Sequence, residues 1–307
     1  MLTPIRWGGS GSDVATFSNA TRRLATACPS SAWTPRSWRC TPGCSAGSSR
    51  VCRRRSSPRT GAADARALLA PTGTVERVDD GFRLSGRWEW ATGIMHAEWV
   101  MVAAMEAERG PRFCVVPRAD VEVEDVWHVA GMAATGSNAI VARDVFVPAH
   151  RTLEIRRIHT GETPGEALHA GTNVGWPMAA TLVLVAATPA LGAAEGALDA
   201  FTERMREKVQ AYSGQKHAEI PATHFRLGEG IATANAARLV WRDAIATLDR
   251  IGPLGAAAPS EERAAIRLAA AHVVRLANTV ADGLARPPAR ARHSSRRRFS
   301  AICATSR

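Results

Sequence analysis

Residues 67–155 contain short strand-like runs that end at Gly, Pro or Asp-rich turns. Gly81–Trp90 alternates between polar and apolar side chains, and Trp99–Met105, Arg112–Pro117 and Ala139–Pro148 are further predicted strands. Side chains two positions apart lie on the same face of a β-strand, so the alternation in Gly81–Trp90 predicts a strand with one buried face. Because no helical segment separates these runs, we expect a central antiparallel β sandwich or barrel.

Residues 177–285 follow a different pattern, in which apolar side chains recur every three or four positions. This period predicts three long helices, over residues 178–212, 223–250 and 260–284. The first half of the first helix carries no charge and is therefore expected to be buried. A closed bundle needs a fourth helix. The fold class is thus α+β, with incomplete N-terminal helices, a β domain and an incomplete C-terminal antiparallel helix bundle.

Two stretches, residues 34–66 and 286–307, follow neither pattern. They divide the chain into a remnant N-terminal helical domain at 1–66, a β domain at 67–155, a helix bundle at 156–285 and a basic tail at 286–307. Residues 34–66 hold eight Arg and one Asp, and residues 286–307 hold seven Arg and no acidic residue. Subtracting these fourteen net charges from the total of +11 leaves −3 for the rest. The body of the protein therefore lacks the basic composition typical of nucleic-acid binding.

The cysteines share this uneven distribution. Five of the six lie in or beside the basic stretches, namely Cys28, Cys40, Cys44, Cys52 and Cys303. A Cys-rich metal module is one interpretation of residues 34–66, although the spacing lacks a CxxC pair and a nearby His. A basic nucleic-acid-binding arm and a solvated linker are two others. The tail is also compatible with a natural disordered segment.

A fourth interpretation is that residues 34–66 are translated from a shifted reading frame and are disordered. In this shifted frame, each new codon consists of the third base of one codon between Arg36 and Cys44 and the first two bases of the codon that follows it. With Arg as CGN and Ser as TCN, this frame permits Val-Leu-Ala-Val-His-Ala-Trp-Met-Leu. Such an apolar helix would continue naturally from Leu24–Trp33. We favour this hypothesis, and the tail after Ala285 looks similar, because it interrupts a strongly amphipathic pattern.

The chain shows no clear membrane or export signal. No apolar run reaches the roughly 18 residues of a membrane span, and residues 1–9 lack the apolar core of a signal peptide. We expect a soluble cytoplasmic protein.

Several motifs resemble the acyl-CoA dehydrogenase superfamily, and more closely its flavin-dependent monooxygenase branch, the oxygenase components of two-component aromatic hydroxylases. In the β domain the resemblance rests on Gly81–Gly93, Trp127–Asn138 and Asp144–Pro148. In the helical regions it rests on Arg6–Gly9, Ala27–Trp33, Tyr212–Gln215 and Phe225–Glu229. Members of this family usually begin with a further stretch of helix, so we expect that Met1 is an internal Met of a longer pattern.

The resemblance implies a flavin site on the β domain. Trp90-Ala91-Thr92-Gly93 resembles the flavin segment of the family, in which a hydroxyl such as that of Thr92 contacts the N5/O4 edge and an aromatic ring such as that of Trp90 forms a wall. Thr135, Gly136 and Ser137 could also approach the flavin. An ordinary strand end with Trp90 in the core, and a plain β-turn at 135–137, are the alternatives.

The resemblance also implies the reaction and its partners. Reduced flavin (FMN or FAD), delivered by a separate flavin reductase, reacts with O2 to hydroxylate a small aromatic substrate, typically a phenol that a His base ionises. Intact relatives are usually homotetramers, which is doubtful for this chain. The likeliest bases of the family come from the segments that 34–66 and the tail replace. The catalytic residues of this chain are therefore unknown, and we expect weak or no turnover.

Other polar residues are weaker candidates. We expect His96 and His128 to be structural or exposed, His217 and His224 to flank a solvated loop, and Glu195 to lie on the surface. The sequence has no GxGxxG after a strand, no P-loop and no zinc pair. Two other functions stay open: an acyl-CoA dehydrogenase that oxidises a Cα–Cβ bond, and a non-enzymatic binding protein that uses its two basic stretches.

Overall fold

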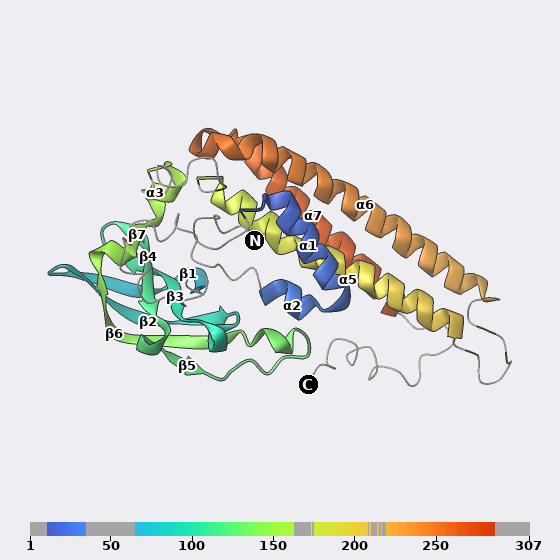
Figure 1. The fold of residues 1–307 in the computed structure, drawn as a ribbon, viewed down its shortest axis with the longest axis horizontal. Coiled ribbons are helices and arrows are strands. Elements are labelled where there is room, and N and C mark those ends of the chain that lie inside the picture. The colour runs from blue at the N-terminus through green and yellow to red at the C-terminus, as the bar shows by residue number, and fades with distance from the viewer. Residues whose placement is uncertain are drawn as a thin grey trace.

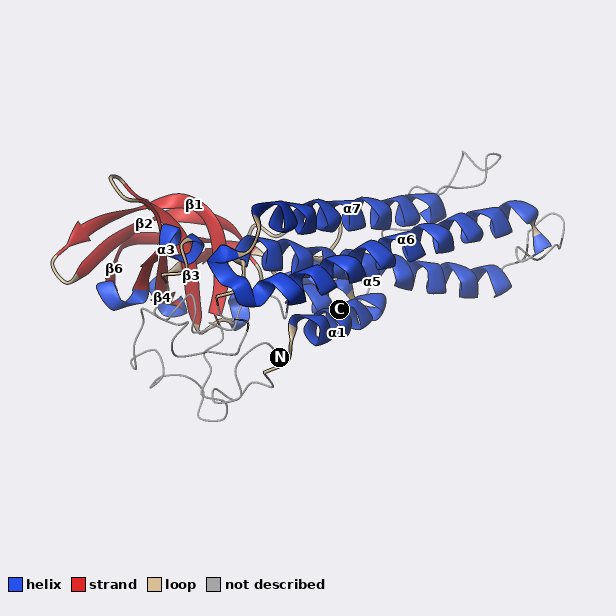
Figure 2. Cartoon of the chain, turned by 90° about the horizontal axis from the view of Figure 1, so that it is seen from above, coloured by secondary structure: helices blue, strands red, loops and turns tan. Residues whose placement is uncertain are grey.

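A computed structural model describes residues 11–34, 65–162, 175–207 and 219–285, together with positions 173, 209, 214 and 216. The basic tail and most of the expected aberrant stretch at 34–66 lie outside these residues. So do Arg6–Gly9 of the N-terminal motif. The described residues form a sheet at one end of an elongated molecule and a helix bundle at the other (Figures 1 and 2), as the α+β class predicts.

The sheet has seven strands in the order β5-β6-β2-β1-β3-β4-β7. Their bounds are β1 Ala65–Val78, β2 Gly81–Ala91, β3 Trp99–Glu106, β4 Gly110–Pro117, β5 Glu122–Glu124, β6 Asn138–Pro148 and β7 Thr152–Glu154. All four predicted strand runs are strands here. The alternation works as expected in β2, where Phe82, Leu84 and Trp88 are buried and Arg83, Ser85 and Arg87 are exposed.

One strand pair differs from the expected antiparallel arrangement, because β1 and β3 run parallel, with Ala65 opposite Trp99 and Val75 opposite Glu106. The reason lies in the connection. β2 returns antiparallel to β1 and therefore finishes beside the start of β1. Residues 92–98 then carry the chain past that end to the other side of β1, so β3 must leave in the direction of β1. This connection contains part of the site described below.

Trp88 organises the centre of the sheet. Its ring is 1% exposed and its Nε1–H donates to the carbonyl of Ala103 at 2.7 Å. The ring lies against two glycines. A Cβ at Gly73 would be 2.2 Å from Trp88 Cζ2, and a Cβ at Gly86 would be 2.4 Å from the Cα of Gly73. Both strands shift register here, which makes room for the indole.

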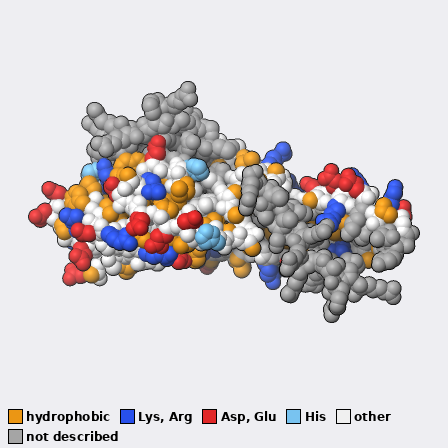
Figure 3. Space-filling view, turned by 90° about the horizontal axis from the view of Figure 1, so that it is seen from below, with side chains coloured by type: hydrophobic (Ala, Val, Ile, Leu, Met, Phe, Trp, Pro, Cys, Tyr) orange, Lys and Arg blue, Asp and Glu red, His pale blue; other side chains and the backbone are white. Residues whose placement is uncertain are grey.

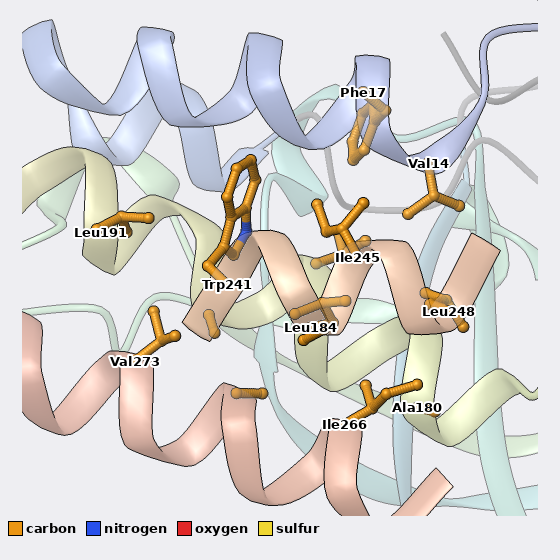
Figure 4. Close-up of a cluster of buried hydrophobic side chains, with 14 of the residues drawn as sticks. Val14, Phe17, Ala180, Leu184, Leu191, Trp241, Ile245, Leu248, Ile266 and Val273 are labelled. Atoms are coloured by element: carbon orange, nitrogen blue, oxygen red, sulfur yellow. The ribbon is translucent and has the colours of Figure 1, made fainter. Parts of the chain in front are cut away.

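The helices are α1 Val14–Ala27, α2 Pro29–Trp33, α3 Ile155–His159, α5 Met178–Glu207, α6 Pro221–Ile251 and α7 Ser260–Ala285. Short 3-10 turns connect several elements, among them η3 Ile94–His96, η5 Ala133–Thr135 and η6 Ala149–Arg151. The three long helices match the predicted ones, and their apolar faces meet in a core that includes Leu184, Trp241 and Ile266 (Figure 4).

Helix α5 is long and apolar enough to pass a test for a membrane span, but 56% of that window is buried inside the protein. It is the central helix of the bundle, and α1, α6 and α7 all pack on it (Figure 2). Its apolar character therefore follows from burial among other helices. Helix α1, from the N-terminal part of the chain, also packs on α5. The predicted fourth helix belongs to the tail after Ala285, which lies outside the described residues.

The expectation that Glu195 lies on the surface is wrong. Glu195 is 8% exposed, and its two carboxylate oxygens pair with Arg22 of α1 and Arg238 of α6, the latter at 2.8 Å. Two flanking glycines let α1 approach this closely. A Cβ at Gly192 would lie 2.2 Å from the carbonyl oxygen of Arg22, and a Cβ at Gly196 would meet Thr26 at the same distance. A buried carboxylate needs such partners, and they come from distant parts of the chain.

Candidate functional site

The end of β2 carries the first half of the site. Trp90 has φ 64°, a left-handed conformation that is strained for a bulky residue, and its side chain is 68% exposed. The backbone N–H of Thr92 donates to the carbonyl of Trp90 at 2.8 Å, which closes the tight turn. The alternative that Trp90 is a core residue is therefore wrong. Strain combined with an exposed ring is a feature of functional sites.

The segment that precedes β6 meets this turn. The backbone N–H of Gly93 donates to the carbonyl of Thr135 at 2.8 Å. Ala91 pairs with Asn138 across the sheet, and the Asn138 side chain accepts hydrogen bonds from the backbone of Val126 and Trp127. These contacts join the two segments that the sequence singled out, although 45 positions separate Thr92 from Ser137.

Three hydroxyl groups form a row where these segments meet. Ser137 Oγ is 2.7 Å from Thr135 Oγ1 and 2.9 Å from Thr92 Oγ1. The two hydrogen bonds use two of the three hydroxyl protons, so one O–H stays available. Thr135 and Ser137 are 2% and 3% exposed, whereas Thr92 is half-buried. Because buried donors need partners, the spare proton belongs on Thr92, the one hydroxyl that a ligand can reach.

A tryptophan from the N-terminal helices is hydrogen-bonded to the end of this row of hydroxyls. Trp33, the last residue of α2, donates its Nε1–H to Thr92 Oγ1 at 3.3 Å. On the same side, the Ser30 hydroxyl lies 3.9 Å from the sulfur of Met132, the residue before η5. The sequence analysis did not place Trp33 or Met132 in the site. The signal was available for Trp33, because it ends the Ala27–Trp33 motif.

Trp33 and Met132 also line a cavity of about 920 Å³. Its other walls are Pro29 of α2, residues of α5 between Val183 and Ala193, and residues of α7 between Ala264 and Val274. The lining consists of Ala, Val, Leu, Pro, Met and Trp side chains with a single charged residue, Arg267. An apolar cavity thus adjoins the row of hydroxyls.

Groups that titrate near neutral pH are scarce around the cavity. The described lining contains no His, Asp or Glu. A neighbouring titratable group is the thiol of Cys28, at the start of α2, whose pKa is lowered by hydrogen bonds from the hydroxyl and backbone N–H of Ser31. Within the part of the chain that the structure describes, no three His, Cys, Asp or Glu residues are grouped to hold a metal ion.

The remaining candidates lie elsewhere. His96 and His128 are exposed, as expected. His224 is exposed as well and lies in the first turn of α6, directly after the predicted loop. His217 and the residues Tyr212, Ser213 and Gln215 of the C-terminal motif lie outside the described residues. On the face in Figure 3, acidic and basic side chains are interspersed over the described surface, which gives no support to a basic binding face there.

Comparison with known proteins decides the family. Residues 184–287 match the model of the family described as acyl-CoA dehydrogenase, C-terminal domain. The pigment production hydroxylase of a Rhodococcus strain is 32% identical over 296 residues, which cover 93% of this chain and 74% of that protein. The chain belongs to the flavin-dependent monooxygenase branch of the acyl-CoA dehydrogenase superfamily. The resemblance found in the sequence is thereby confirmed.

Other members of this branch agree. The oxygenase subunit HsaA of a flavin-dependent monooxygenase from Mycobacterium tuberculosis is 31% identical, over 80% of this chain and 63% of that protein. The oxygenase component of an FADH2-dependent resorcinol hydroxylase from a Rhizobium strain is 35% identical, over 57% of this chain and 45% of that protein. These names favour the aromatic monooxygenase interpretation over an acyl-CoA dehydrogenase or a binding protein.

A solved structure of the branch extends the similarity to the fold. XiaF from a Streptomyces species, in complex with FADH2 and glycerol, has a TM-score of 0.80 and 28% identity, and it covers 92% of this chain and 73% of that one. A reduced flavin is thus bound by a close structural relative. The prediction that this family uses a flavin is thereby confirmed. The choice between FMN and FAD stays a prediction.

Proposed function

We propose that this chain is the oxygenase component of a two-component flavin-dependent monooxygenase that hydroxylates a small aromatic ring, typically a phenol. The observation that carries the proposal is the hydrogen-bonded row of Thr135, Ser137 and Thr92. The Thr92 hydroxyl at its end can donate to a ligand and lies beside an apolar cavity. A flavin ring has polar atoms along one edge and apolar faces. A donor next to an exposed aromatic side chain and an apolar cavity fits both features.

Each residue named by the sequence receives a role in this proposal. Thr92 donates to the N5/O4 edge of the flavin, and Ser137 and Thr135 hold the Thr92 hydroxyl in position. Trp90 forms an aromatic wall. Ala91, Gly93 and Gly136, which carry small side chains or none, let the backbone approach the ring. When bound, the reduced flavin supplies the two electrons that activate O2. The apolar lining keeps water away from the reacting groups.

The partners follow from the names of the relatives. An oxygenase component needs reduced flavin from a separate reductase, together with O2 and an aromatic substrate. FMN and FAD are both candidates, and a homotetramer in the cytoplasm is the expected state of intact relatives. No base for phenol ionisation lies among the described lining residues. We therefore propose that turnover is weak unless residues outside the described ranges supply one.

Binding of reduced flavin tests the site directly. Anaerobic titration of the full chain with reduced FMN and reduced FAD should give saturable binding for one of them. The variant Thr92→Val should weaken that binding about 10-fold, because one hydrogen bond to a partly desolvated ligand contributes about 1.4 kcal/mol. Thr74→Val, at an exposed position of β1, is the matched control. Equal affinities for Thr92→Val and wild type would disprove the assignment of Thr92.

Turnover tests the reaction separately. The chain is supplied with a flavin reductase, NADH and resorcinol, and hydroxylated product is measured against total O2 consumption. We expect flavin-dependent O2 consumption in which little of the oxygen reaches the aromatic ring. Reduction of a tightly bound flavin by an acyl-CoA, without product from resorcinol, would instead support the acyl-CoA dehydrogenase alternative.

A further inference from the structure

The cavity between α2, α5 and α7 has one charged residue in its described lining, and that residue has no partner among the described residues. Arg267 lies on α7 and is exposed. It makes no ion pair or hydrogen bond with any described residue. Three other arginines of the bundle are used differently: Arg22 and Arg238 pair with Glu195, and Arg250 pairs with Glu262.

From this arrangement we infer that Arg267 is an anion-binding residue of the cavity, and that the preferred ligand is a flat apolar molecule with one acidic group. This inference rests on the proposed function only in treating the cavity as the substrate site. A guanidinium binds a carboxylate through a charge-assisted, often bidentate, hydrogen bond. The rest of the lining offers apolar contact alone.

The dimensions of the cavity agree with such a ligand. Small-molecule sites commonly have volumes of roughly 300–1,000 Å³, with apolar walls and a few polar groups that fix orientation. The present cavity, at about 920 Å³, is large enough for a two-ring aromatic acid. Trp33 and Met132 form the wall next to the hydroxyl row, so the apolar body of the ligand would lie toward the proposed flavin position.

The sequence places Arg267 well for this task. Ala264 and Ala271 lie one turn before and one turn after it on α7, and both belong to the lining. Their methyl groups leave the Arg267 side chain free to turn along the helix surface toward the cavity. In water alone a single exposed arginine binds a carboxylate weakly. An adjacent apolar wall adds burial of the ring, so the two contacts act on one ligand.

Calorimetric titration with a matched pair of probes tests the inference. The probes are 1-naphthoate and the neutral 1-naphthylmethanol, added to the full chain without flavin at low ionic strength. We expect naphthoate to bind at least 10-fold more tightly, because a charge-assisted bond contributes about that factor. Arg267→Gln should lower naphthoate affinity about 10-fold and leave the alcohol unchanged, and Arg267→Lys should retain most of the preference.

Two further variants locate the ligand. Arg242→Gln changes an exposed arginine of α6 outside the cavity and should leave both affinities unchanged. Ala271→Phe fills the cavity next to Arg267 and should weaken both probes more than 10-fold. The inference is wrong if naphthoate has no advantage over the alcohol, if Arg267→Gln keeps that advantage, or if neither probe binds. Normal binding of reduced flavin by the same preparation would show that the proposed function survives such a result.

Discussion

The two halves of the candidate site are built in opposite ways. The β-domain half consists of hydroxyls and backbone groups from two short segments, 90–93 and 135–137, held in register by the sheet. The helical half is an apolar cavity whose walls come from residues 29–33, 183–193 and 264–274. The first half depends on local turns and hydrogen bonds. The second exists only while α1, α2, α5 and α7 stay packed together, so it is the more vulnerable half.

The largest effect is expected from removing the carboxylate that joins α1, α5 and α6. Glu195→Ala leaves Arg22 and Arg238 without their buried partner, and loss of one member of a buried pair costs about 3–5 kcal/mol of unfolding free energy. Urea unfolding followed by circular dichroism measures the loss. Glu203→Ala, at an exposed position of α5, is the control and should change stability by less than about 0.5 kcal/mol. Comparable losses in both variants would contradict the assignment.

A second prediction uses the same change at two helical glycines. In Gly192→Ala the new methyl group meets the Arg22 carbonyl, so we expect a net destabilisation of about 1–3 kcal/mol. Gly228 of α6 has no atom within 4 Å of its Cβ position, so Gly228→Ala should stabilise by about 0.5–1 kcal/mol through helix propensity. If the two variants change the unfolding free energy in opposite directions, the loss in Gly192→Ala comes from the contact between α1 and α5. If thermal unfolding shows that both variants are stabilised, α1 moves to accommodate the new methyl group without cost.

The third prediction concerns the sheet that carries the β-domain half, and the pH dependence of its stability. Burial raises the pKa of Glu106, but the hydrogen bonds and charges of Arg112 and Arg77 outweigh burial and hold it below its usual value of 4.5. The unfolded state therefore takes up its proton first, and the stabilisation is complete above pH 4.5 and is lost as the pH falls through the lowered pKa. The unfolding free energy should fall less steeply with acid in Glu106→Gln than in wild type. If the unfolding free energies of Glu106→Gln and wild type fall with acid at the same rate, Glu106 does not have this role.

The smallest effect tests the link between the halves. Trp33→Phe keeps an aromatic ring in the cavity wall and removes the 3.3 Å hydrogen bond to Thr92. We expect reduced-flavin affinity to fall only about 2- to 5-fold, because Thr92 keeps its bond to Ser137. Unfolding free energy should change by less than about 1 kcal/mol. A loss of flavin binding as large as that in Thr92→Val would show that Trp33 positions the hydroxyl.

The site could be predicted from the sequence only where its residues lie in recognisable motifs. Trp90 ends a run of clear alternation, Thr92 follows it, and Thr135–Ser137 precede another strand, so both segments were named. Trp33 was part of a motif but its partner was not evident, because nothing in a linear pattern shows that α2 reaches the β domain. Glu195 was misjudged for the same reason, since its arginines lie 173 and 43 positions away.

Periodicity and composition were enough to predict the α+β class, the three long helices, the main strands and the uneven distribution of charge. Both are local properties of the chain. Three other features follow only from the folded arrangement: β3 runs parallel to β1, α1 packs against the glycines of α5, and a cavity with one arginine in its described lining adjoins the hydroxyl row. Each of these depends on which distant surfaces come into contact, and that depends on the shape and packing of whole elements.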